Sequence, residues 1–96
     1  MTQIERRSTL IVNEKGLHAR ASAKLARLAL TLPVPVIIAH DGETADARSI
    51  MDLLCLGAAH GRQVELSAEG DGAAQALEAV SRLFAEGFGE LEEDAA

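Results

Sequence analysis

The chain has 96 residues, enough for one domain with a modest core, and only two of its side chains are aromatic. A formal net charge of −6 argues against binding to nucleic acids or anionic membranes, and so few aromatic rings leave little for stacking on bases or sugars. The single cysteine, Cys55, excludes an internal disulfide and is expected to be a small buried apolar residue.

The first predicted elements are a strand and a helix. Residues 8–13 form a short β-rich run after a charged start, so a strand is expected there, followed by a turn at 14–16. From Leu17 onward the apolar residues fall at helical spacing. This pattern predicts a helix over 18–31, which ends before Pro33 because a residue that precedes proline resists helical geometry.

A hairpin is predicted next. The β-branched run over 34–40 indicates a buried strand, and His40 at its end is expected on the surface. Asp41-Gly42 is the strongest hairpin signal in the chain and leads to a short strand at 43–45.

The remaining elements complete the order βαββαβα. A short helix is expected over 48–56, and alternating apolar and polar residues predict a half-exposed strand over 63–68. Asp71 can cap a last helix. The acidic tail, 90–96, is expected to fray, which leaves one domain at 1–89. The predicted fold is α+β, a two-layer open sandwich of four strands with helices on one face.

No membrane or metal function is indicated. The first residues lack the apolar segment of a signal peptide, and the longest apolar stretch, 28–39, is too short to span a membrane. We therefore expect a cytoplasmic protein. His60 is expected in a loop, and the histidines and Cys55 lack zinc-ligand spacing, so neither metal nor cofactor is expected.

Charge is unevenly distributed along the chain. Residues 15–40 include four basic and no acidic residues, while the remainder has five basic and fifteen acidic ones. The four basic residues are Lys15, Arg20, Lys24 and Arg27. Such a cluster is either a solvated helix face formed by chance or a site for an anion or an acidic partner.

The segment Gly-Leu-His-Ala-Arg at 16–20 lies where the turn meets the predicted helix. The first N–H groups of a helix lack internal partners, and the helix dipole is positive there, so this point suits an anion. The dipole also favours neutral, nucleophilic His18. A phosphoryl group on His18 would face these N–H groups, with Arg20 as a planar donor and Lys24 adding longer-range attraction. The plainer interpretation is that His18 merely caps or packs against the helix start.

A second segment of interest is 48–57. Ser49 with Asp52 three residues later is an N-cap pattern, and a phosphate added to Ser49 would be tolerated at a helix N-terminus. The apolar residues that follow Ser49 are too many for one face of a short helix. Some are expected to be exposed as a docking patch, unless the helix is buried on most sides.

Together these motifs resemble HPr, the histidine-containing phosphocarrier of the bacterial phosphotransferase system. The resemblance covers 8–86 and is carried by the segments 16–20, 48–57 and 67–70. It implies an open-faced β-sandwich with a four-stranded antiparallel sheet and three helices. It also implies a stoichiometric carrier within the phosphotransferase system instead of an enzyme that turns over substrate.

The resemblance also implies roles for single residues. His18 would accept a phosphoryl group on Nδ1 from phosphorylated enzyme I and pass it to an enzyme IIA-type protein. Arg20 would steady the phosphate, and Ser49 would be the target of a dedicated HPr kinase/phosphorylase found in some lineages. Docking is expected at Ile50, Met51 and Leu54, as the resemblance implies, and at the basic helix face that holds Lys24 and Arg27.

Two residues depart from the family pattern. Ala21 stands where many members have proline, and the Ala-Ser-Ala that follows Arg20 resembles a nitrogen-related regulatory branch. Asp52 stands where the docking helix often has a basic or small residue. We expect a monomer that binds no nucleic acid. The alternative function is a regulatory interaction module that acts through phosphorylation of Ser49 without histidine phosphotransfer.

Overall fold

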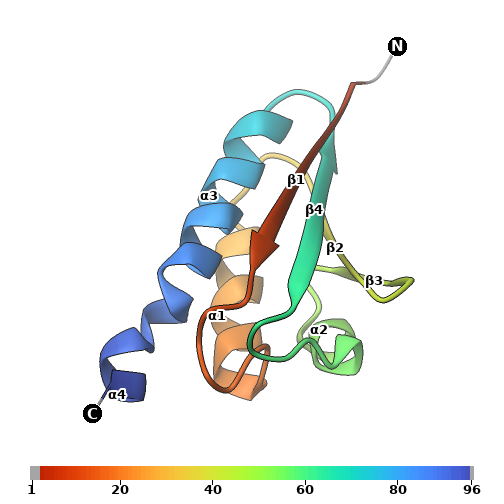
Figure 1. Cartoon of the computed structure of the whole chain (residues 1–96). Helices are drawn as coiled ribbons and strands as arrows, with labels where there is room; N and C mark the ends of the chain where they lie inside the picture. Colours follow the sequence, from red (N-terminus) through yellow and green to blue (C-terminus); the bar gives the residue numbers. More distant parts are fainter. Residues whose placement is uncertain (1–2, 96) are drawn as a thin grey trace.

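The structure, a computed structural model, describes residues 3–95 and is built on a four-stranded antiparallel sheet. The strands, in the order β1-β4-β2-β3, are β1 (Ile4–Leu10), β4 (Gln63–Glu69), β2 (Val36–His40) and β3 (Glu43–Asp46). The two longer helices, α1 (Ala19–Ala29) and α3 (Ala73–Ala85), lie on one side of this sheet, and the other side is open (Figure 1). The predicted α+β open-faced sandwich is thereby confirmed.

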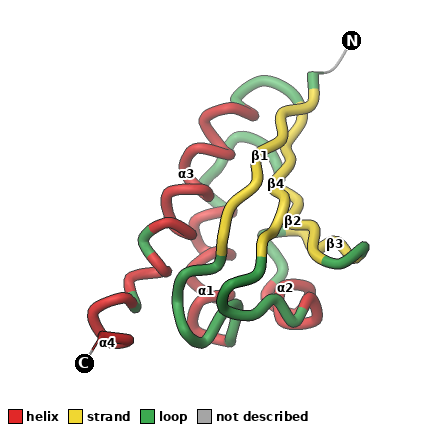
Figure 2. Tube along the Cα trace, viewed as in Figure 1, coloured by secondary structure: helices red, strands yellow, loops and turns green. Residues whose placement is uncertain are grey.

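One end of the molecule collects the shorter elements and the long loops. The helix α2 (Ile50–Leu56) packs against β3 and α1. The loop from β1 to α1 and the loop from α2 to β4 come together at the same end, beside α4 (Leu91–Ala95) (Figure 2). The start of α1 therefore lies among segments from both halves of the sequence.

The core lies between the sheet and the helices. In β4 the alternate residues Val64, Leu66 and Ala68 are buried, as the sequence pattern predicts. The register of β2 places the buried residues Val36 and Ile38 opposite Ala68 and Leu66. The helices complete this core with Ala21, Leu25, Ala76, Leu77, Val80 and Phe84.

The first strand lies earlier than predicted, at Ile4–Leu10 instead of 8–13. It is an edge strand, and among the described strands it pairs only with β4, from Ile4 opposite Glu69 to Leu10 opposite Gln63. Most of its residues are exposed, so its charged side chains obscure the alternation on which the prediction depended. The residues 11–13 leave the sheet and turn into the loop.

Two residues differ from the prediction in their burial. His40 is buried, not on the surface, because the alternation along β2 places it on the same covered face as Val36 and Ile38. Cys55 is exposed, not buried. The short helix α2 buries only Leu53 and Leu56, which leaves Cys55 on its solvent side.

The ends of two helices also differ. Asp71 does not cap α3: the N-cap is Gly72, with φ +89°, and no side chain makes a cap hydrogen bond there. A positive φ suits glycine, so the turn into α3 depends on backbone conformation instead of a capping side chain. The helix α1 ends at Ala29, and the predicted last turn is replaced by turn hydrogen bonds from Thr31 and Leu32.

The acidic tail, predicted to fray, forms ordered turns in the structure up to residue 95. After α3 the chain forms a short 3₁₀ turn, η1 (Gly87–Gly89), and then α4. Phe88 is buried and packs edge-to-face on Phe84, with ring centroids 4.9 Å apart. Glu90 is only 2% exposed. Packing of the buried Phe88 and hydrogen bonds of Glu90 thus hold the segment η1–α4, which from its composition alone was expected to be solvent-exposed.

Candidate functional site

The loop that enters α1 is fixed by Gly16. Its φ is +62°, and a Cβ at this position would lie 2.5 Å from the carbonyl oxygen of Ala58. The next residue, Leu17, donates its N–H to that same oxygen at 3.0 Å. Only glycine allows both the left-handed conformation and this close approach. The loop is thus joined to the α2–β4 connection directly before His18.

His18 is the N-cap of α1. Its backbone is extended, with φ −76° and ψ −177°, and its carbonyl oxygen accepts the N–H of Ser22 at 2.9 Å. Its side chain makes no cap hydrogen bond, so the first N–H groups of α1 have no acceptor from it. Unpaired N–H groups and the positive end of a helix dipole favour an anion at this point.

The imidazole of His18 has one engaged nitrogen. Nε2 lies 2.7 Å from Oε2 of Glu90, and the ring is about a quarter exposed, at 25%. Among residues 3–95, no hydrogen bond to Nδ1 is found. Of the two ring nitrogens, Nδ1 is therefore the one that is free to react.

Glu90 and Asn13 form a buried support behind the ring. The Nδ2 group of Asn13 donates to Oε1 of Glu90 at 3.0 Å and to the carbonyl oxygen of Gly16 at 2.9 Å. Asn13 is fully buried, and within the described chain its Oδ1 is the buried side-chain atom left without a partner. Both N–H groups of the Asn13 amide are therefore hydrogen-bonded to the site, while its oxygen has no partner.

The charge state of Glu90 follows from its surroundings. Burial alone would raise the pKa of this carboxyl, but hydrogen bonds from Asn13 and His18 outweigh it. The charges of His18 and Arg20 act in the same direction, and the net result is a pKa below the usual range. Glu90 is therefore a carboxylate at neutral pH.

The cationic residues near His18 are engaged by the C-terminal segment. Arg20 holds Glu93 in a two-point contact, with Nη1 at 2.9 and 3.2 Å from the two carboxylate oxygens. Lys24 donates to the carbonyl oxygen of Phe88 at 2.7 Å. A further contact runs from the N–H of Glu14 to Asp94 at 3.0 Å. The tail therefore lies on the basic helix start.

Ser49 lies at the N-cap of α2, as the sequence pattern predicts. Its Oγ accepts the N–H of Asp52 at 3.2 Å. The preceding Arg48 is paired with Asp46 at 2.7 Å, and this hydrogen bond holds the pKa of the Asp46 carboxyl below its usual range. The start of α2 is thus an ordered, partly exposed corner.

The predicted docking residues lie on the surface of α2 and α1. Met51 is 69% exposed, and Ile50 and Leu54 are also exposed, while Leu53 and Leu56 face the core. Arg27 is exposed on α1, whereas Lys24 is half-buried. The helices α1 and α2 contact each other, and Arg27 lies in the last turn of α1. Figure 1 shows α2 at the end of the molecule where α1 begins.

Three site residues were missed in the sequence: Asn13, Glu90 and Glu93. They lie in a predicted strand and in a predicted frayed tail. One signal in the sequence could have found the two glutamates. The acidic tail is complementary in charge to the basic residues at the helix start, and Phe88 and Leu91 give the tail apolar side chains that can be buried.

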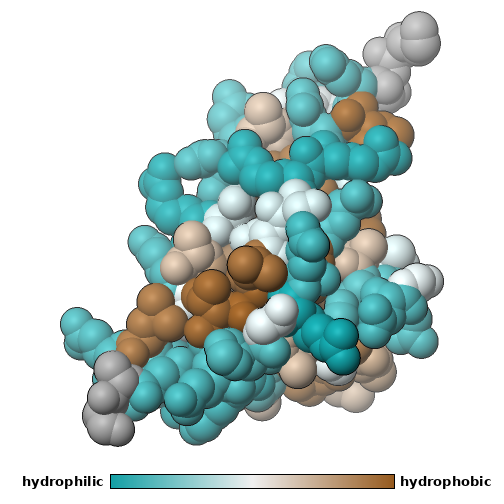
Figure 3. All heavy atoms as spheres, in the orientation of Figure 1, coloured by the Kyte–Doolittle hydropathy of each residue, from teal (hydrophilic) through white to brown (hydrophobic). Residues whose placement is uncertain are grey.

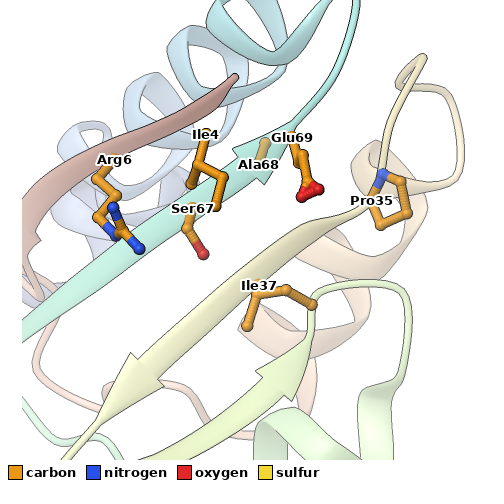
Figure 4. Close-up of a pocket in the computed structure, with 7 residues that line it drawn as sticks. All are labelled: Ile4, Arg6, Pro35, Ile37, Ser67, Ala68 and Glu69. Atoms are coloured by element: carbon orange, nitrogen blue, oxygen red, sulfur yellow. The ribbon is translucent and has the colours of Figure 1, made fainter. Parts of the chain in front are cut away.

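The surface also has a hollow on the sheet and an apolar patch near the C-terminal segment. A hollow of about 280 Å³ on the open face of the sheet is lined by residues such as Ile4, Ile37 and Glu69 and lies near the start of β1 (Figure 4). Apolar side chains gather over the end of β1 and toward α4 (Figure 3), where Leu10, Val12 and Leu91 are exposed. The hollow belongs to the opposite end of β1 from the loop that leads to His18.

The described residues offer neither a candidate metal centre nor a candidate membrane-spanning helix. Within residues 3–95, no group of three or more His, Cys, Asp or Glu side chains is placed to hold a metal ion. No helix in this part of the chain has the length and apolar character needed to cross a membrane.

Comparison with known proteins gives consistent matches over most of the chain. The family model described as the PTS HPr component phosphorylation site matches residues 5–86. A phosphocarrier protein HPr from Cupriavidus necator is 43% identical over 86 residues, which are 90% of this chain and 97% of that protein. A phosphocarrier protein NPr from Klebsiella oxytoca is 42% identical over 81 residues, 83% of this chain and 90% of its own. The crystal structure of HPr-C-His from Thermoanaerobacter tengcongensis has a TM-score of 0.84 at 35% identity, over 90% of this chain and 97% of that one.

Proposed function

We propose, because the chain belongs to the HPr family of the phosphotransferase system, that His18 is the residue on which it carries a phosphoryl group. Membership of this family makes the protein a phosphocarrier and not a catalyst, and HPr proteins function with the enzymes of that system. Relatives named HPr and NPr match at nearly equal identity, so the proposal concerns the relay step that both names share.

One observation carries the assignment to His18. Its Nδ1 has no hydrogen-bond partner among residues 3–95 and lies at the start of α1, where backbone N–H groups are unpaired. A phosphoryl group on Nδ1 would place its negative oxygens at the positive end of the helix dipole. The 25% exposure of the ring is enough for an incoming donor to reach it.

Arg20 supports the same step as a phosphate-binding residue. Its guanidinium is exposed, and its Nη1 already donates to both oxygens of the Glu93 carboxylate, so the group is placed where it can bind an anion. A phosphoryl group on His18 would compete with Glu93 for the guanidinium of Arg20. The phosphoryl group carries more charge, so we expect Arg20 to exchange partners on phosphorylation.

The donor and acceptor proposed are phosphorylated enzyme I and an enzyme IIA-type protein. Both would dock on the apolar surface formed by Ile50, Met51 and Leu54, with the basic face of α1 that holds Arg27 as a second contact. Ser49 is proposed as a regulatory site of a dedicated kinase. A phosphate there would add about two negative charges directly beside Ile50 and Met51 and weaken apolar docking.

The test is to mix the protein with enzyme I and phosphoenolpyruvate and to measure its mass. We expect a gain of one acid-labile phosphoryl group, which His18→Ala abolishes while Ser49→Ala retains it. Labelling that persists in His18→Ala would refute the proposal. Labelling of Ser49 by a kinase and ATP, with no label ever found on His18, would instead support a purely regulatory module.

A further inference from the structure

Glu90 stands out as a buried, ionised group beside His18. It lies beyond residue 86, where the match to the family model ends. Its side chain is 2% exposed, and Oε2 lies 2.7 Å from Nε2 of His18. A buried carboxylate is costly unless it is hydrogen-bonded or balanced by charge, so its position needs an explanation.

The two oxygens of Glu90 define which nitrogen of His18 carries a proton. Oε1 accepts from the amide of Asn13 at 3.0 Å, and the low pKa of the carboxyl leaves no proton on Glu90 to donate. The contact at 2.7 Å therefore requires a hydrogen on Nε2. In a neutral imidazole with Nε2 protonated, the lone pair is on Nδ1.

The position of Glu90 is itself rigidly set. Phe88 is buried, packs on Phe84 and has φ +56°, a conformation that non-glycine residues rarely adopt. Glu90 N–H then donates to the carbonyl oxygen of Gly87 at 2.9 Å. Packing of this quality holds a hydrogen-bond acceptor in place without help from solvent.

We propose that Glu90 is a positioning residue that holds His18 in the tautomer with Nε2 protonated and so directs phosphoryl transfer to Nδ1. The inference rests on the proposed function of His18 and deepens it. A carboxylate that orients a histidine through the far ring nitrogen is a general device for fixing tautomer and ring orientation.

The transfer step balances without moving a proton. The lone pair of Nδ1 forms the bond to phosphorus, and the bond from phosphorus to the donor atom breaks with its electron pair going to the donor. The ring becomes positively charged and keeps its hydrogen on Nε2. The carboxylate of Glu90, at 2.7 Å, lies where it offsets that charge. On transfer to an acceptor, the electron pair returns to Nδ1.

The test reads the tautomer directly. In protein labelled with ¹⁵N-histidine, multiple-bond ¹H–¹⁵N spectra of the unphosphorylated wild type should show His18 with hydrogen on Nε2. In Glu90→Gln we expect a mixture of tautomers and phosphoryl acceptance slower by about 10–100-fold. Glu90→Asp should restore part of both. The matched control is Glu92→Gln, which removes the same charge from an exposed neighbour and should leave the spectrum and rate unchanged.

The outcomes separate this inference from the proposed function. A wild-type His18 with its hydrogen on Nδ1 would overturn the role of Glu90, even if every variant failed to fold. An unchanged tautomer and rate in Glu90→Gln, with wild-type labelling on His18 intact, would overturn it too and leave the carrier function standing. A wild type that never labels on His18 would refute the carrier function itself.

Discussion

At the scale of single residues, the site contains two glutamate carboxylates, one paired with His18 and the other with Arg20. Glu90 takes the inner position against His18, and Glu93 takes the outer position against Arg20. The outer pair is weak because both side chains are more than half exposed, at 51% and 61%. Exposed pairs of this kind contribute about 0.2–1 kcal/mol. Arg20 is therefore available to a stronger anion.

Arg20→Ala should slow phosphoryl acceptance by about tenfold, the lower end of what a hydrogen bond to a charged group contributes. The rate of phosphoryl acceptance in Arg20→Lys should lie between those of the wild type and Arg20→Ala, since lysine keeps the charge and loses the planar fork. The free energy of unfolding in urea should change by less than about 1 kcal/mol. Arg6→Ala removes an exposed arginine from β1 and serves as the control. If the Arg20 variants lose phosphoryl acceptance only as far as they lose free energy of unfolding, Arg20 has no role in binding the phosphate.

The positions of His18 and Arg20 at the start of α1 could be predicted from the sequence because they depend on neighbours along the chain. A glycine turn, a helix start and a basic cluster are all local. Glu90 could not, because it lies 72 residues from His18 and its approach depends on how Phe88 packs. The same holds for Asn13, whose partner Glu90 is 77 residues away.

At the scale of elements, α1 is placed by the turn before it more than by its own cap. No side-chain cap is found at its start, and the loop is held by the contact of Gly16 and Leu17 with Ala58. The long helices were predictable because their buried faces recur with helical spacing. The edge strand β1 and the segment η1–α4 were not, because their order comes from pairing and packing with distant residues.

Gly16→Ala tests how strictly the turn is set. We expect a loss of about 3 kcal/mol in the free energy of unfolding, since a Cβ would clash with a backbone oxygen at 2.5 Å in addition to the strain of a positive φ. Gly57→Ala is the matched control. Its φ is +61° with no atom within 4 Å of the new Cβ, so only about 1 kcal/mol of conformational strain applies. Equal losses in urea denaturation would show that the contact with Ala58 is unimportant.

At the scale of the whole molecule, the segments proposed to act in phosphoryl transfer and its regulation are gathered at one end. The start of α1, the corner at Ser49 and the acidic helix α4 lie there, while the hollow on the open sheet face lies near the other end of β1 (Figures 1 and 4). The net charge of −6 therefore says little about this end, where basic side chains and a buried carboxylate meet. Partner choice is expected to depend on the exposed surface of α2.

Met51→Asp should raise the KM of phosphoryl transfer from enzyme I by about tenfold with kcat nearly unchanged, because a charge would enter an apolar interface. Leu30→Asp is the matched control. Leu30 is equally exposed, at 69%, but follows the far end of α1. Neither variant should change the free energy of unfolding by more than about 0.5 kcal/mol. Equal KM values for the two variants would place the docking surface elsewhere.

The most direct measurement of the carrier role is a ³¹P NMR spectrum of the phosphorylated protein labelled with ¹⁵N-histidine. If Nδ1 of His18 carries the phosphoryl group, the spectrum should show one phosphoryl resonance with a one-bond coupling to Nδ1 of His18, absent in His18→Ala. A phosphoryl resonance coupled to Nε2, or one that survives in His18→Ala, would contradict it.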